Sequence, residues 1–191
     1  MPKPNSSEAI EEVREALGVF QEGYTKRDMN YVDEYMKEVF LLEEEQVVIG
    51  TDAEELCIGN KAIRGIIESD WKFWGDFTMN VDGASITVNG DIAYFSTKAM
   101  IKRTIPKTKM LEWATDSANR FFKEESKNSK HKLMDTLSSI LEFLQESERG
   151  EVYIAPMRFS GVLVKCEGKW LIHHAQYSDY TDKMPGSRIV K

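Results

Sequence analysis

Two hairpin signals constrain the fold of this chain more than any other feature. Asn89-Gly90 stands between Thr78–Val88 and Ile92–Lys102, two stretches in which apolar and polar residues alternate. Such a dipeptide favours a type I′ turn, because both central residues of that turn need a positive φ. A second pair of alternating stretches, Val152–Cys166 and Lys169–Tyr180, meets at Glu167-Gly168. The pattern predicts four long antiparallel strands, with Asp82-Gly83 as a bulge or bend in the first.

Helical spacing replaces this alternation before Phe77, and it predicts three helices. The first has Asn5 as its N-cap, and its apolar stripe consists of Ile10, Val13, Leu17, Phe20 and Tyr24. The second is capped by Asp28 and places Tyr31, Tyr35 and Val39 on one face. A short strand is predicted at residues 46–49. The third helix begins near Asn60, ends at Gly75 and carries Ile63, Ile67, Trp71 and Trp74 on one side.

Residues 106–150, between the two hairpins, carry a helical pattern of their own. One apolar stripe consists of Leu111, Ala114, Ala118 and Phe121, and a second of Leu133, Leu137, Ile140 and Leu144. This pattern predicts a helical hairpin inserted between sheet strands of a single domain, residues 1–191. Because helices come first and antiparallel strands follow, the predicted fold class is α+β rather than a parallel doubly wound sheet.

Three stretches of the sequence resemble the NTF2-like superfamily and its SnoaL-like branch. They are the opening helix pair around GYTKRDMNYVDEYM, the segment VVIGTDAEELCIGNKAIRGIIESDW at residues 47–71, and the closing strand GKWLIHHAQYSDY at residues 168–180. The likeness covers about residues 8–105 and 151–180 and leaves out the inserted hairpin. It implies a cone-shaped, curved antiparallel sheet wrapped around three N-terminal helices, and homodimers that pair through the outer sheet face. It implies no single activity, since members include isomerases, cyclases, epoxide hydrolases, dehydratases and non-catalytic binders.

Composition argues against several classes of protein. Apolar residues make up 41% of the chain, and no run of about eighteen apolar residues is available to span a membrane. The net charge of −7 argues against nucleic-acid binding, although Lys102–Lys132 holds nine basic residues against four acidic ones. The N-terminus lacks the apolar core of a secretory signal, and two distant cysteines, Cys57 and Cys166, suit reduced thiols. We therefore expect a cytoplasmic protein.

The candidate catalytic residues are His174, Asp52 and Asp76. Strand alternation puts Trp170, Ile172, His174, Gln176 and Ser178 on one face, which the resemblance assigns to the pocket. A histidine titrates near neutral pH and can serve as acid or base, but His174 is equally explained as a core-edge residue bonded to a backbone carbonyl. Asp52 and Asp76 follow glycine-containing turns near the expected mouth of the cone, and both are also explained as turn residues.

The predicted ligand contacts are mainly aromatic or polar side chains of the third helix and the long strands: Trp71, Trp74, Tyr94, Arg158, Trp170, Ile172 and Gln176. The alternative interpretation of aromatic residues at helical spacing is that they belong to the core and contact no ligand. Arg158 needs a carboxylate partner if it faces inward and is otherwise a solvated outer residue. No metal site is predicted, because the chain has three histidines and adjacent His173 and His174 point to opposite faces of a regular strand. No sequence motif indicates a cofactor.

Three hypotheses for the function remain open. The first is a binding module for a small apolar or aromatic molecule, in an aromatic-lined pocket with His174, Gln176 and Tyr94 as polar contacts. The second is a cofactor-independent acid–base enzyme acting on a small apolar substrate as an isomerase, cyclase, dehydratase or hydrolase. The third is a protein–protein interaction domain that docks through the basic helical insertion. That insertion is alternatively a lid over the cone.

Overall fold

The chain divides into two compact units, residues 1–101 with 155–179 and residues 102–154 with 180–191. The computed structural model describes residues 7–51, 55–104 and 152–179, and within 105–151 only residues 112, 115, 116, 118–120, 122, 123, 128–134, 136, 137 and 140. Asn5 and Asp52 therefore lie outside the described residues. All residues of the candidate site belong to the first unit.

The first unit contains the three predicted helices, α1 (Ser7–Lys26), α2 (Val32–Val39) and α3 (Gly59–Phe73). Gly75 has a φ of 97° and ends α3 as predicted, since glycine adopts this conformation without steric cost. The predicted cap at Asp28 is wrong. Its Oδ1 accepts the backbone N–H of Asn30 at 3.0 Å, and so it closes a turn before α2 instead of capping the helix.

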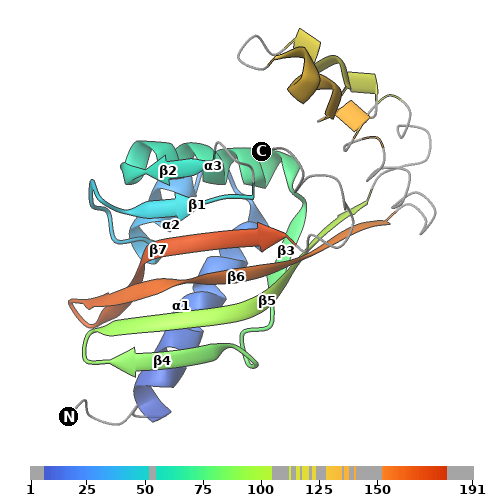
Figure 1. Ribbon diagram of the computed structural model, residues 1–191. Helices are drawn as coiled ribbons and strands as arrows, with labels where there is room; N and C mark the ends of the chain where they lie inside the picture. The colour runs from blue at the N-terminus through green and yellow to red at the C-terminus, as the bar shows by residue number, and fades with distance from the viewer. Residues whose placement is uncertain are drawn as a thin grey trace. The chain divides into compact units, whose positions relative to one another are not determined.

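Seven strands form one curved sheet (Figure 1). They are β1 (Val47–Ile49), β2 (Leu56–Ile58), β3 (Asp76–Met79), β4 (Ser85–Asn89), β5 (Ile92–Thr104), β6 (Val152–Cys166) and β7 (Lys169–Asp179). The order is β2-β1-β7-β6-β5-β3, with β4 also paired to β5. The class is α+β, as predicted. The sheet is mixed, however, because β1 runs parallel to β7 while β4–β5 and β6–β7 are antiparallel hairpins.

Three local predictions about the strands need correction. The stretch 78–88 is two strands, β3 and β4, because residues 80–84 leave the ladder in a turn. Strand β2 was not predicted, since three residues show no alternation that a sequence can reveal. In the first hairpin, Asn89 pairs with Ile92, so Gly90 and Asp91 occupy the turn. Gly90, with a φ of 63°, takes the first central position, where a type II′ turn needs glycine.

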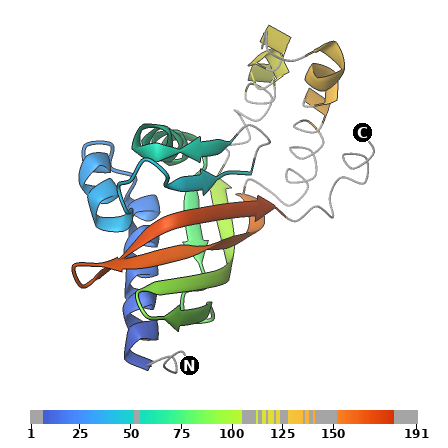
Figure 2. The same ribbon diagram turned by 60° about the vertical axis from the view of Figure 1, so that its left-hand side comes forward.

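Helix α1 packs against β3, β4 and β7 and covers the inner face of the sheet (Figures 1 and 2). Along β5, Phe95 and Ile101 are buried, whereas Tyr94 and Met100 are exposed, so alternation separates an inner from an outer face. The apolar stripe of α1, from Val13 to Tyr24, is buried in the core between the two layers.

A β-bulge in β7 inverts the predicted alternation. Ile172 pairs with Leu163 on β6, but His174 pairs with Val162, which leaves His173 as the extra residue. Beyond this point Ala175 and Tyr177 are buried, and Gln176 is exposed. The prediction of one inward face from Trp170 to Ser178 is therefore correct only as far as Ile172.

The second unit is described only in part. Residues 129–134 are helical, and Asn128 Oδ1 accepts the N–H of His131 at 3.0 Å as an N-cap. The ammonium of Lys132 donates to the backbone carbonyl of Phe122 at 3.2 Å and so joins this helix to the preceding helical segment. The predicted stripe residues Leu133 and Leu137 are exposed. Most of residues 106–150 lie outside the described residues, so the helical insertion and its docking or lid role stay predictions.

Candidate functional site

Aromatic rings from α1 and the strands fill the interior between α1 and the sheet. Phe20 stacks on Tyr24 at 5.0 Å and on Phe159 at 4.9 Å between ring centroids. Phe159 in turn stacks on Tyr177 at 4.6 Å. Phe77 contacts both Tyr24 and Tyr177. This cluster brings helix, β3, β6 and β7 residues together around one set of contacts, and it supplies the apolar surroundings of the site.

Asp70 is the one carboxylate among the buried residues that the structure describes, with 3% of its surface exposed. The Tyr24 hydroxyl donates to its Oδ2 at 2.9 Å, and the Tyr177 hydroxyl donates to Tyr24 at 3.3 Å. Among the described residues, no lysine or arginine forms an ion pair with it. These contacts make a chain of three polar groups, Asp70–Tyr24–Tyr177, which we call the buried triad.

Burial shifts the ionisation of the whole triad. Loss of hydration raises the pKa of Asp70 to about 8; the hydrogen bond from Tyr24 opposes the rise and the charge of Glu55 adds to it. Burial raises the pKa of Tyr24 and of Tyr177 well above 10, with a further rise from the charge of Asp70. At pH 7 Asp70 is therefore mainly a neutral carboxylic acid. A neutral carboxyl both donates and accepts hydrogen bonds.

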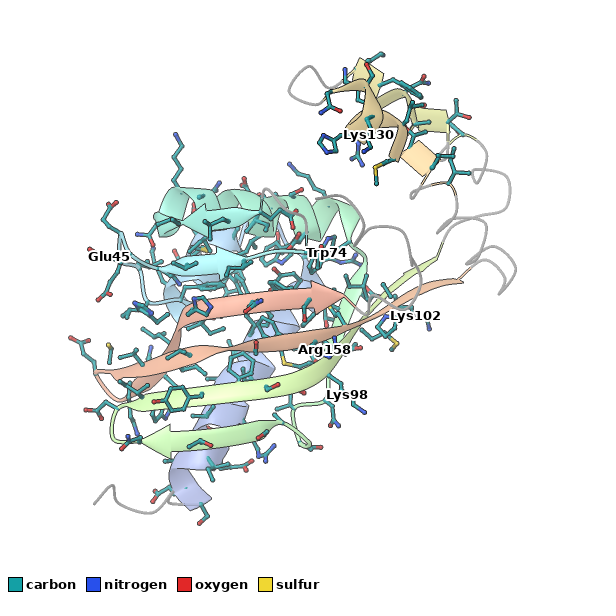
Figure 3. The ribbon with its side chains drawn as sticks, in the orientation of Figure 1. Glu45, Trp74, Lys98, Lys102, Lys130 and Arg158 are labelled. Atoms are coloured by element: carbon teal, nitrogen blue, oxygen red, sulfur yellow. The ribbon has the colours of Figure 1, made fainter. Side chains whose placement is uncertain are left out.

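Two tryptophans of α3 border the triad. The Trp71 indole, 5% exposed, contacts Tyr24 and Tyr35, and its buried Nε1–H has no hydrogen-bond acceptor among the described residues. A buried donor without an acceptor is costly and rare in proteins. Trp74 is half-buried and lies between α3 and β7 (Figure 3), with its ring 5.3 Å from that of Tyr177. Trp74 thus links the buried triad to the surface.

The predicted catalytic residues do not come together. Asp76 forms a surface ion pair with Arg27, in which the guanidinium Nη2 lies 2.7 Å from Oδ1. His174 lies on the outer face of β7, opposite to Tyr177, because the extra residue His173 shifts the alternation of the strand by one position. Asp52 is outside the described residues. His174 and Asp76 therefore do not face a common site in the structure.

The predicted ligand contacts divide between the two faces of the sheet. Trp71 and Trp74 border the triad. Ile172 and Trp170 are buried on the inner face, where the Trp170 Nε1–H donates to Glu12 on α1 at 2.9 Å. Three of the predicted contacts, Tyr94, Arg158 and Gln176, are exposed on the outer face of β5, β6 and β7.

Sequence reasoning missed the buried triad, although the sequence carries a signal for Asp70. This residue stands three positions after Ile67 and four before Trp74, which puts a carboxylate inside the apolar stripe of α3. An acidic residue at such a position must be buried with a partner or pointed to water. Tyr177 was missed for a different reason, since the unpredicted bulge placed it on the opposite face.

A shallow groove of about 250 Å³ lies outside the interior, between α1 and α2. Its lining includes Val19 and Tyr31 and several charged side chains, with Glu22, Lys26, Asp28 and Glu38 among them. Tyr31 donates to Glu38 and Lys26 pairs with Glu22, so polar groups of this groove already bond to one another.

Nowhere in the described residues do three or more His, Cys, Asp or Glu side chains gather as a metal ion would require. None of the helices they form combines the length and apolar character of a membrane span. Cys57 and Cys166 are both free thiols.

Solved structures similar to this chain share its fold. An NTF2-like superfamily protein from Salmonella enterica aligns with a TM-score of 0.59 at 16% identity, covering 96% of this chain and 99% of its own. An NTF2-like protein of unknown function from Shewanella oneidensis gives 0.52 at 13% identity, covering 88% and 98%. A candidate dehydratase of the NTF2-like family from Streptomyces avermitilis gives 0.56 at 11% identity, covering 90% and 96%. A search of the curated proteins finds no match.

A family model supplies the assignment that these distant structures do not. The model described as a SnoaL-like domain matches residues 13–127, which is more than half of the chain. The match begins within α1, includes α2 to β5 and continues past residue 105 into the segment predicted as an insertion. The protein belongs to the SnoaL-like domain family, and its fold is that of the NTF2-like structures.

Proposed function

We propose that this domain binds a small, largely apolar molecule whose one polar group bonds to the buried triad. The observation that carries the proposal is a neutral carboxyl, Asp70, held among aromatic rings without a cationic partner in the described residues. An apolar surround with a few fixed polar groups is the usual composition of small-molecule sites.

The energetic cost of Asp70 supports a role beyond packing. A buried carboxyl whose pKa is raised destabilises the folded chain at neutral pH relative to an uncharged isostere. Residues that cost stability are retained mainly where function requires them. The Trp71 ring contacts Tyr24, and its Nε1–H, which has no acceptor among the described residues, adds a second polar group that a ligand acceptor would satisfy.

Half-buried Trp74 is the proposed entry point. Its ring contacts both tyrosines of the triad, so a rotation of one side chain changes access to the interior. The ligand then replaces ring–ring contacts with contacts to Tyr24 and Tyr177, at little cost in apolar burial.

A thermal-shift screen tests this function. The panel contains small hydrophobic acids, terpenoids and aromatic polyketides, and a binder is expected to raise the Tm of the wild-type chain by mass action. Each hit is then repeated with Asp70→Asn, which keeps an acceptor for Tyr24 but removes the acidic proton. We expect the shift to shrink with this variant. Tyr94→Phe, which removes a hydroxyl from the exposed outer face, is the matched control and should leave the shift unchanged.

Two results would contradict the proposal. One is a panel of which no member raises the Tm. The other is a set of hits that respond to Tyr94→Phe but not to Asp70→Asn, because binding would then occur on the outer face of the sheet.

A second candidate function is acid–base catalysis without a cofactor, in which Asp70 replaces the predicted His174 and Asp76. A carboxyl with a pKa of about 8 is close to the value that proton transfer near neutral pH favours. The similar structure named as a candidate dehydratase is consistent with this chemistry. Incubation of the hits in deuterium oxide separates catalysis from binding. Mass spectrometry would detect deuterium uptake or the gain or loss of water, and Asp70→Asn should abolish it.

A further inference from the structure

The second unit exposes apolar side chains on two of its helical segments. Phe122 is 51% exposed, and Leu133 and Leu137 are 52% and 59% exposed. Leu133 and Leu137 are four positions apart and therefore share one face of a helix. The hydrogen bond from Lys132 to the carbonyl oxygen of Phe122 holds the two segments side by side. Apolar side chains gathered in this way on a surface indicate that another body covers them.

Lysines accompany these apolar side chains. Lys130 stands three positions before Leu133 and so lies on the same side of the helix (Figure 3), and Lys123 directly follows Phe122; both lysines are exposed. The stretch Lys102–Lys132 as a whole holds nine basic and four acidic residues, which leaves 16 basic and 28 acidic residues to the rest of the chain. The second unit therefore carries a concentration of positive charge on an otherwise acidic protein.

Charge and area together indicate what covers this surface. The lysines favour an anionic partner. The three exposed apolar side chains described here supply much less than the about 800 Å² that each side of a specific protein complex buries. A lipid surface requires no complementary shape, because apolar side chains enter the boundary between headgroups and acyl chains while lysine ammonium groups extend to the phosphates. Each lysine or arginine near an anionic bilayer strengthens binding about fivefold.

We infer that the second unit binds the surface of an anionic lipid bilayer through Phe122, Leu133 and Leu137, with Lys123 and Lys130 at the lipid phosphates. An anionic surface repels the acidic remainder of the chain, so that remainder stays on the aqueous side. The attachment is reversible, because a few apolar side chains and lysines bind much more weakly than a spanning helix does.

Sedimentation of the full-length chain with lipid vesicles tests the inference. One set of vesicles consists of phosphatidylcholine alone, and the other contains about one third phosphatidylglycerol. We expect the wild type to bind the mixed vesicles at least about tenfold more tightly, and to lose affinity as salt is added. Leu133→Gln with Leu137→Gln should weaken this binding about tenfold or more. Lys123→Gln with Lys130→Gln should weaken it about twentyfold and reduce its salt dependence.

Two double variants in the first unit are the matched controls. Leu56→Gln with Ile58→Gln changes two apolar residues of β2 that are 59% and 55% exposed, close to the exposure of Leu133 and Leu137. Lys37→Gln with Lys72→Gln changes exposed lysines of α2 and α3 and shifts the net charge as much as the lysine variant of the second unit does. Both controls should keep the affinity of the wild type, and circular dichroism should show that every variant is folded.

Three outcomes would overturn the inference. The first is a wild-type chain that binds neither set of vesicles, or binds both equally. The second is a loss of binding in the controls that equals the loss in the second-unit variants, since the contact would then lie elsewhere. The third is a chain that does not bind vesicles but binds soluble poly-L-glutamate, as fluorescence anisotropy would show, because the partner would then be an acidic protein.

Discussion

At the scale of single residues, Asp70 makes the stability of the domain depend on pH. Its pKa is raised from 3.8 to about 8 by burial, so between these values the folded state holds a proton that the unfolded state has lost. Stability therefore falls as pH rises through this range, by up to about 1.4 kcal/mol per pH unit, and levels off above the folded pKa.

Asp70→Asn is expected to remove this dependence. An asparagine has no proton to lose but still accepts the hydrogen bond from Tyr24, so the variant should be more stable than the wild type at pH 8 and close to it at pH 4.5. Urea unfolding at several pH values measures the difference between the two chains, in which other titrating groups cancel. A difference that stays constant with pH would mean that Asp70 is already ionised in the folded protein.

At the scale of elements, the bulge in β7 allows side chains both before and after it to face the core. Trp170 and Ile172 precede it and Ala175 and Tyr177 follow it, and all four are buried. Gly161 on β6 lies beside this point. A Cβ on Gly161 would come within 2.3 Å of the His174 carbonyl oxygen, so only glycine fits this approach of the two strands.

Deletion of His173 should therefore be tolerated. Without it, β7 becomes a regular strand in which Ile172 and Ala175 still face inward, because exactly one outward residue then separates them. We expect a folded protein that has lost about 1–2 kcal/mol, from the altered twist and from the loss of the contact between His173 Nε2 and Glu43 Oε2, which lie 3.9 Å apart. Deletion of Leu171 is the control. It turns either Trp170 or the segment after it to the outer face and should prevent folding, as a chemical-unfolding curve would show. Equal behaviour of the two deletions would argue against the bulge.

The sequence predicts elements that are long and periodic, and it misses those that depend on tertiary contacts. The prediction of the β6–β7 hairpin was correct, because alternation continues over most of both strands. The bulge could be inferred from His173-His174, two polar residues between the inward Ile172 and Ala175, but a regular strand was the simpler interpretation. Strand β2 and the parallel pairing of β1 with β7 leave no such pattern, because three-residue strands acquire their structure from their neighbours.

At the scale of the whole molecule, the position of the site was predicted less well than the fold. Family resemblance and element order were sufficient for the α+β class. Helical spacing put Trp71 and Trp74 on one side of α3, but their contact with a ligand stays a prediction. Asp70 and Tyr177 needed the structure, since burial and face depend on the packing of α3 and on the register of β7. A carboxyl acquires a raised pKa only from the surroundings that the complete core provides.

The boundary between the two units leads to a final prediction. All residues of the buried triad, and all of the buried aromatic cluster, belong to the first unit, residues 1–101 with 155–179. Strands β5 and β6 are neighbours in the sheet, so a short Gly/Ser linker can join Ile101 to Ala155 in place of residues 102–154. We expect this shortened chain to unfold cooperatively and to keep the pH dependence that Asp70 causes, because the interactions responsible are retained.

Replacement of residues 112–140 alone by a linker is the control for damage at the strand ends. Aggregation of both chains would show that the second unit completes the core, and it would agree with the family match that continues to residue 127.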